Sequence, residues 1–326
     1  MSEKVLLLPG DGIGPIVTAA AEKVLSMATD SVEIVHGMIG KSAFEETGQY
    51  LPHETMDLLD ECKIILSGPV FTPESGVDPL KTLKVQLDLY ARARYFRTLA
   101  PDLGVDGLEM VLWGSNNNVS SEITEVTELD GVTISKYIKS TSYSRMMSLA
   151  LSDVEIRKLE RVTCLTRPDF FPISSGMFAD TFQTMFPADV YETRILNVKD
   201  WASHLLKTPS LDQCIICVDM YSHVVSGILG GLTGYDHLCP TCYIGDEYRL
   251  YQPRHKATIE GLEDKYINPT ASILSSATIL RDLGLKDEAE SIVNAVKETY
   301  VAGERCPDVG GNLTTDEFVE KIISRV

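Results

Sequence analysis

A regular alternation between short apolar runs and helical segments in the first third of the chain constrains the fold most. Residues 5–8 form an apolar run that ends at a glycine-rich turn, and residues 16–27 then have helical periodicity. Residues 32–36 and 63–66 predict further strands, and residues 53–62 predict a helix between them. Strands that alternate with helices favour a parallel sheet with helices on both faces. We therefore expect an α/β protein.

The middle of the chain has a different pattern. Residues 110–139 are rich in β-branched residues around the turn signal Asp130-Gly131, which predicts an antiparallel arm or hairpin. After residue 253 the pattern returns to helices. The chain of 326 residues is long enough for two domains, and no Pro/Ser-rich linker separates them. We predict interleaved domains: a large α/β domain from residues 1–98 and 245–326, and a small central domain from residues 99–244.

The net charge of −18 limits the partners that the chain can bind. Nucleic acids and anionic membranes are bound mainly by Lys and Arg side chains, so neither is expected as a partner. A small anionic ligand needs only a few local cations. No apolar segment is long enough to predict a membrane span or a signal peptide. The seven cysteines are odd in number and scattered, which favours reduced thiols and a cytoplasmic protein.

Two cysteine pairs have spacings similar to those of a four-cysteine zinc site. Cys214 and Cys217 lie in an apolar strand, where residues three apart point to opposite faces and make a poor chelate. Cys239 and Cys242 lie in a loop that could bind a metal or react as thiols. Buried thiols are the favoured interpretation, with zinc as the alternative.

Four ordered segments resemble one enzyme family. They are the turn from Leu8 to Pro15, residues 48–52 followed by 63–68, the run Leu87-Asp-Leu-Tyr-Ala91 with Arg94 after it, and residues 268–276, which begin Asn-Pro-Thr-Ala, with Leu283-Gly284 after them. Together they resemble the β-decarboxylating isocitrate, isopropylmalate and homoisocitrate dehydrogenases. The resemblance implies an isopropylmalate-dehydrogenase-like fold, with an open, mostly parallel sheet domain and a smaller central α/β domain. It also implies a dimer, in which the central domain supplies an arm and interface helices.

The family oxidises a 2-hydroxy acid with NAD or NADP and then decarboxylates it, with a divalent cation held by three aspartates as the Lewis acid. At these positions the sequence has Lys199, His223 and Gly227. Mg²⁺ is therefore not expected, and Lys199 could place an ammonium group where the cation would be. A relocated metal site of Asp200, Asp219 and His223 is the alternative.

The positions of the family's acid–base residues have also changed. Arg167 replaces the lysine, and Asp169 replaces the asparagine two residues later. An arginine stays protonated, so it cannot relay a proton as a lysine can. Ser120 stands at the tyrosine position, where a serine has no accessible pKa for the role. The catalytic candidates are thus the degenerate positions Arg167, Lys199 and His223, with His223 as the natural base.

Ligand recognition is partly retained. Of three arginines that grip carboxylates in the family, Arg94 is kept, whereas Lys84 and Trp113 stand at the other two positions. Ser120 completes this substrate-binding set, and the neighbouring Arg92 is expected to be exposed to solvent. The resemblance assigns a dinucleotide to His255, Glu260 and Asn268. Because the acid Glu260 favours a free ribose 2′-hydroxyl, the expected dinucleotide is NAD rather than NADP.

Two functional hypotheses follow from the sequence. The first is a non-catalytic or regulatory family member that binds a small carboxylate ligand and can retain NAD, as a homodimer or as a hetero-oligomer with a catalytic relative. The second is a divergent NAD-dependent dehydrogenase of a 2-hydroxy acid related to isocitrate or 3-isopropylmalate. This second protein would work without the usual Mg²⁺.

Overall fold

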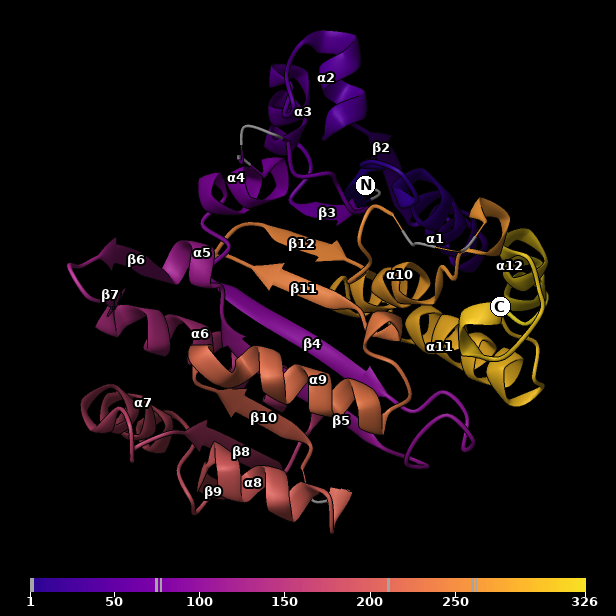
Figure 1. The fold of residues 1–326 in the computed structure, drawn as a ribbon. Coiled ribbons are helices and arrows are strands. Elements are labelled where there is room, and N and C mark those ends of the chain that lie inside the picture. Colours follow the sequence, from indigo (N-terminus) through magenta and orange to yellow (C-terminus); the bar gives the residue numbers. More distant parts are fainter. Residues whose placement is uncertain (1–2, 74–75, 77, 210–211, 259–260, 262) are drawn as a thin grey trace.

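The computed structural model describes residues 3–73, 76, 78–209, 212–258, 261 and 263–326. Within these ranges, ten strands form one large sheet and two further strands form a hairpin (Figure 1). From edge to edge, the large sheet consists of β2 (Val32–His36), β1 (Glu3–Leu8), β3 (Ile64–Ser67), β12 (Arg249–Gln252), β11 (Thr241–Ile244), β4 (Ala91–Arg97), β5 (Glu109–Ser115), β10 (Cys214–Cys217), β8 (Arg161–Thr166) and β9 (Glu192–Asn197).

The sheet is parallel toward both edges and antiparallel in its centre. The pairings of β12 with β11, of β11 with β4 and of β4 with β5 are antiparallel. The remaining pairings are parallel. The expected α/β fold with a mostly parallel sheet is thus confirmed, and the antiparallel centre is an addition that the alternating pattern did not predict.

Helices cover both faces of the sheet (Figure 1). On one face lie α1 (Gly14–Ala28), α6 (Ser140–Arg157), α7 (Pro172–Met185) and α10 (Thr270–Asp282), with α11 (Lys286–Val301) and α12 (Thr315–Ile323) packed behind. On the other lie α4 (Pro79–Gln86), α8 (Val198–Leu205) and α9 (Ser222–Leu232), near the short α2 (Lys41–Thr47), α3 (His53–Asp57) and α5 (Asn117–Ser120). Strand β1 is apolar at every position from Val5 to Leu8 because both of its faces are covered.

The two-stranded hairpin consists of β6 (Ser121–Thr127) and β7 (Val132–Ile138), and it projects from the edge of the molecule (Figure 1). The predicted arm at residues 110–139 therefore begins later than expected. Residues 109–115 instead form β5, which is buried because it pairs with β4 on one side and β10 on the other. The hairpin exposes several apolar side chains, namely Ile123, Val126, Val132, Ile134 and Tyr137.

One continuous sheet joins the two parts of the chain. Strands β2, β1, β3 and β12 come from the ranges predicted for the large domain, whereas β11, β5, β10, β8 and β9 come from residues 99–244. Strand β4 belongs to the first range but pairs with two strands of the second. The domain boundaries themselves stay a prediction. None of the helices in the described ranges combines the length and the apolar character that a membrane crossing requires.

The first turn of the chain holds a distant loop in place. Gly12 has a φ of 58°, and a Cβ atom there would lie 2.0 Å from the backbone oxygen of Ala257. This close approach lets the Ile13 amide donate to the same oxygen at 3.0 Å. The loop that carries His255 is thereby fixed against the start of α1.

Candidate functional site

Two arginines of β4 leave the sheet on the same face. Arg92 and Arg94 are two residues apart on a strand, so their side chains point in the same direction. Arg92 lies opposite Tyr243 of β11 and opposite Gly114 of β5. Because Gly114 has no side chain, the Arg92 guanidinium has room to reach α9, which crosses this face of the sheet (Figure 1).

We call the resulting group, Lys84, Arg92, Ser222, His223 and Tyr243, the cationic face. Arg92 Nη2 donates a hydrogen bond to Ser222 Oγ at 2.8 Å, and its Nη1 lies 3.5 Å from His223 Nε2. The Lys84 ammonium lies 3.8 Å from the centre of the Tyr243 ring. Arg92 is only 8% exposed and Lys84 7%. The expectation that Arg92 is exposed to solvent is therefore wrong, because α9 covers it.

The cationic face carries more positive than negative charge. Neither Lys84 nor Arg92 forms an ion pair with a carboxylate in the described part of the chain. The Asp219 carboxylate, which is close enough to Arg92 to interact electrostatically, is bound by Lys136 of β7 at 3.0 Å. The site therefore has an unbalanced positive potential, which suits an anion.

Two titratable groups respond to this potential. Burial opposes ionisation of Tyr243, but the nearby Lys84, Arg92 and Arg94 outweigh it, so the pKa of Tyr243 lies below its ordinary value. Burial, followed by the charges of Arg92, Arg254 and Arg94, lowers the pKa of His223. The imidazole is therefore neutral near pH 7 and can accept a proton.

A second cluster, the Asp236 clamp, lies beside the cationic face and consists of Arg94, Ser226, Asp236, Thr241 and Arg254. Arg94 Nη2 contacts Asp236 Oδ1 at 2.9 Å, and its Nε donates to Thr241 Oγ1 at 3.2 Å. Arg254 forms an ion pair with the other carboxylate oxygen of Asp236. Arg94, which the sequence suggested as a carboxylate grip, is thus already bound to a carboxylate of its own chain.

Glycine at position 230 permits the clamp. A Cβ atom on Gly230 would lie 2.6 Å from Asp236 Cβ and 2.7 Å from its Cα. The loop that follows α9 can therefore pack against the helix only where the helix has no side chain. This approach brings Asp236 within reach of Arg254, 18 residues away in the sequence, and of Arg94, 142 residues away.

A pocket with a volume of about 290 Å³ adjoins the clamp and is lined by His237, Arg254, His255, Lys256, Thr258, Asn268 and Asp308. The structure thus brings His255 and Asn268 together, whereas Glu260 lies outside the described residues. The Asn268 amide is held by Asp308 and by Tyr300. His255 Nε2 is buried and has no hydrogen-bond partner among the described residues, so it is available to a ligand in this pocket.

The buried imidazole of His255 predicts a loss of stability in mild acid. Burial, assisted by His237, lowers the pKa of His255 to about 4 from an ordinary value near 6.5. Because this pKa is lower in the folded chain than in the unfolded chain, the neutral imidazole stabilises the fold at pH values above 6.5. This contribution is lost as the pH falls from 6.5 toward 4. We expect the free energy of unfolding to fall by up to about 3 kcal/mol over this window because of His255.

Urea denaturation at a series of pH values checks this expectation. The variant His255→Leu should lose most of the pH dependence, while the matched variant His53→Leu, at an exposed position, should keep it. If the free energy of unfolding depended on pH equally in His255→Leu and in the unaltered chain, folding would not lower the pKa of His255.

The other candidate catalytic residues lie apart from the cationic face. Arg167 Nε binds the Asp169 carboxylate at 2.9 and 3.0 Å, and its guanidinium packs on the ring of Phe170. Lys199 is exposed in the first turn of α8. In the described part of the chain, neither residue forms a hydrogen bond or an ion pair with His223. Their catalytic roles stay a prediction.

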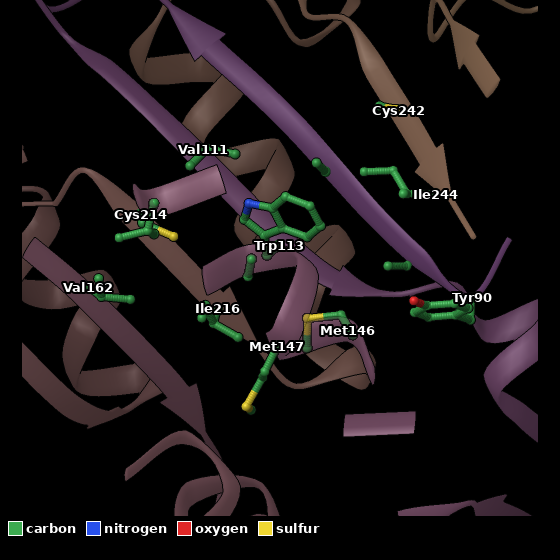
Figure 2. Packing of buried hydrophobic residues seen from close by; sticks show 14 of the residues in the cluster. Tyr90, Val111, Trp113, Met146, Met147, Val162, Cys214, Ile216, Cys242 and Ile244 are labelled. Carbon is green, nitrogen blue, oxygen red and sulfur yellow. The ribbon is translucent and has the colours of Figure 1, made fainter. Parts of the chain in front are cut away.

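Trp113 and Ser120 are buried in the framework. Trp113 leaves β5 on the face opposite to Gly114, and Figure 2 shows its ring packed with Val111 and Ile216 in the core. Its Nε1 donates to Asp153 at 3.2 Å. Ser120 Oγ donates to the backbone oxygen of Tyr90 at 2.9 Å. Among the positions predicted to bind substrate, only Lys84 and Arg94 lie on the face that α9 covers.

Comparisons with known proteins agree with this architecture. Residues 4–322 match the family model described as isocitrate/isopropylmalate dehydrogenase. The 3-isopropylmalate dehydrogenase of Methanothermobacter thermautotrophicus is 29% identical, with 98% of both chains covered. The isocitrate/homoisocitrate dehydrogenase of Thermus thermophilus is 28% identical over 99% of this chain and 98% of the relative. A β-decarboxylating dehydrogenase from Thermococcus kodakarensis has a similar fold, with a TM-score of 0.89, 24% identity, and coverage of 99% of this chain and 96% of that one.

Proposed function

Since this chain belongs to the isocitrate/isopropylmalate dehydrogenase family, we propose that it is a non-catalytic or regulatory member that binds a small carboxylate. The observation that carries the proposal is the cationic face, where Lys84 and Arg92 are buried without a carboxylate partner in the described residues. A buried cation without a partner is unfavourable, and a bound carboxylate would relieve this cost. The guanidinium of Arg92 and the ammonium of Lys84 would supply the charge.

The residues at the family's metal positions do not fit a divalent cation. Mg²⁺ prefers carboxylate and water oxygens, but His223 lies beside the guanidinium of Arg92 and Gly227 has no side chain. Positive charges at Lys84 and Arg92 would also repel a second cation. We therefore expect ligand binding that does not depend on Mg²⁺.

The proton-transfer residues support the same proposal. Arg167 remains protonated and is already paired with Asp169, so it offers no base for oxidation of a hydroxyl group. The decarboxylation step of the relatives' reaction needs an electron sink near the ligand, which a neutral histidine does not supply. We expect the complete reaction to be lost while anion binding is kept.

One observation favours a second candidate function. The neutral His223 lies next to Arg92, so a base and a positive group capable of polarising a carbonyl are adjacent. With NAD in the pocket formed by His255 and Asn268, this pair would suit a divergent dehydrogenase of a 2-hydroxy acid that works without Mg²⁺. Such an enzyme would transfer a hydride but would not need the metal-assisted step.

The proposal extends to an assembly. The hairpin of β6 and β7 exposes apolar side chains, which would be covered if it packed against a second subunit as a homodimer or a hetero-oligomer with a catalytic relative. Lys136 anchors the hairpin to Asp219, three residues before the start of helix α9, which carries His223 in its first turn. A partner on the hairpin would therefore contact an element that is linked to the cationic face.

Formation of NADH by the purified chain distinguishes these functions. We expect no turnover of isocitrate, 3-isopropylmalate or homoisocitrate, either with Mg²⁺ or with a chelator. At the same time, calorimetry should show binding of at least one of these acids with an affinity that the chelator does not change. A regulatory subunit should also co-purify with a relative that has all three metal aspartates.

The other outcomes each contradict part of the proposal. Turnover that the chelator abolishes would show that a working metal site exists. Turnover that survives the chelator and is lost in His223→Ala would favour the second candidate. If none of the acids bound, the cationic face would not be a carboxylate site.

A further inference from the structure

A second group of cations lies around a cavity on the other face of the sheet. The cavity has a volume of about 360 Å³, and its positive side chains are Arg97, Arg157, Arg281, Lys286 and Lys297. We call it the Lys297 groove. Arg97 is five residues from Arg92 on the same strand, so it leaves β4 on the opposite face. The groove is therefore separate from the cationic face.

The groove has two more positive than negative charges. Arg97 is paired with Glu109, Arg281 with Glu290 at 2.9 Å, and Arg157 with Asp153 at 3.2 Å. Lys286 and Lys297 have no ion-pair partner among the described residues. Two cations without partners in one cavity stand out in a chain with a net charge of −18.

Of the two lysines, Lys286 is exposed, whereas Lys297 is partly buried, so the charge of Lys297 is the costly one. Burial, followed by the neighbouring Arg97, lowers the pKa of Lys297, and Glu109 and Glu290 offset this only in part. The side chain of Arg157 is 12% exposed, and its Nε lies 3.2 Å from Asp153 Oδ1 but is not aligned for a hydrogen bond with any of the described residues. A donor in this state is stabilised by a ligand that accepts its hydrogen bond.

A narrow apolar slot continues from the groove. It has a volume of about 30 Å³ and shares Arg97, Glu109, Arg157 and Arg281 with the larger cavity. Its remaining wall is mostly apolar and includes Phe96, Met110, Leu274, Ala277 and Val293. A ligand that fills both spaces would carry a charged head and a short hydrocarbon group.

We propose that the Lys297 groove binds a small dianion with a phosphate head and a short apolar tail. A phosphate monoester carries close to two negative charges at neutral pH, which matches the two unpaired lysines. It also has several acceptor oxygens for Arg157, whose Nε is not aligned for a hydrogen bond with Asp153. Residues from the end of α6, from α10 and from α11 line the groove, so its ligand would contact both parts of the chain that the continuous sheet joins.

Calorimetry on the whole chain with n-propyl phosphate, inorganic phosphate and glutarate tests the proposal. We expect n-propyl phosphate to bind roughly tenfold more tightly than inorganic phosphate, because its tail is removed from water. It should also bind more tightly than glutarate, a dicarboxylate of similar length. Lys297→Met should weaken binding of n-propyl phosphate at least roughly tenfold, since a charged hydrogen-bond donor is lost.

Two control variants test where in the molecule n-propyl phosphate binds. Lys207→Met changes an exposed lysine just after α8 that forms no ion pair among the described residues, and it should leave the affinity unchanged. Arg92→Met alters the cationic face and should also have no effect on n-propyl phosphate. Thermal unfolding checks that each variant folds. If Lys297→Met does not fold, Lys286→Met serves as the groove variant instead.

Three results would overturn the proposal. The first is the absence of binding heat with all three probes. The second is an affinity that Lys297→Met leaves unchanged or that Arg92→Met abolishes, which would move the anion to the cationic face. The third is tighter binding of glutarate than of n-propyl phosphate, which would exclude phosphate as the preferred head group.

Discussion

Replacing Asp236 by alanine is expected to lower the free energy of unfolding by about 3 kcal/mol, because the change leaves a buried charge without its partner. Asp236 is the one carboxylate that pairs with Arg94 in the described residues, and the side chain of Arg94 is only 3% exposed. Burial lowers the pKa of Arg94 and Asp236 opposes this, so the carboxylate is what keeps the arginine charged at low cost. Urea denaturation of the two chains measures the difference.

Chemical rescue makes this expectation specific. Alanine leaves a space next to Arg94 and Arg254, so formate should restore part of the lost stability, whereas chloride at the same ionic strength should not. The matched variant Asp106→Ala removes an exposed carboxylate and should change stability by no more than about 0.5 kcal/mol. If Asp236→Ala were as stable as the unaltered chain, the Asp236 carboxylate would not contribute to the free energy of unfolding. If chloride restored stability as well as formate, the rescue would not depend on a carboxylate next to the two arginines.

Replacing Arg92 by methionine is expected to weaken carboxylate binding by roughly 100-fold, because a buried charged donor is lost while the length of the side chain is nearly kept. Arg92 is the cation of the proposed ligand site that contacts Ser222 directly, at 2.8 Å. Calorimetry with whichever of isocitrate, 3-isopropylmalate or homoisocitrate binds the unaltered chain gives the comparison. The effect should be equal in the presence and absence of Mg²⁺.

The same strand offers a matched control. Arg97 lies on β4 as well, but it points to the opposite face, where it pairs with Glu109. Arg97→Met should therefore leave carboxylate affinity unchanged. If Arg92→Met bound the ligand as well as the unaltered chain, or if both variants lost binding equally, the cationic face would not be the site.

The sequence predicted the outer strands of the sheet and missed its centre. Residues 5–8 and 63–66 were recognised because they form apolar runs that are covered on both faces. Residues 32–36 were recognised by Val32, Ile34 and Val35, although this edge strand also has exposed positions. Strand β4 has the sequence Ala-Arg-Ala-Arg-Tyr-Phe-Arg. Its three arginines predict an exposed segment, because the partners that allow their burial are not visible in the sequence. Strands β11 and β12 are four residues each, too short for a clear periodic signal.

The site was predictable in its residue types but not in its pairings. Arg94 was named from the segment that follows Leu87-Asp-Leu-Tyr-Ala91, yet its partner Asp236 is 142 residues away, and only the fold brings the two together. The burial of Arg92 depends on Gly114 lying opposite it, which follows from strand register and not from composition. One signal was available in advance, because the spacing of Arg92 and Arg94 already placed both on one face of any strand.

The continuous sheet has a consequence for how the molecule holds together. The pairings of β4 with β11 and with β5 join strands of the two parts of the chain. Neither part therefore forms a separate sheet in which every strand has its neighbours. Separating the parts would leave a row of backbone donors and acceptors without partners along a strand that is otherwise central. The two parts are therefore expected to share their stability and to lose their structure in one cooperative step.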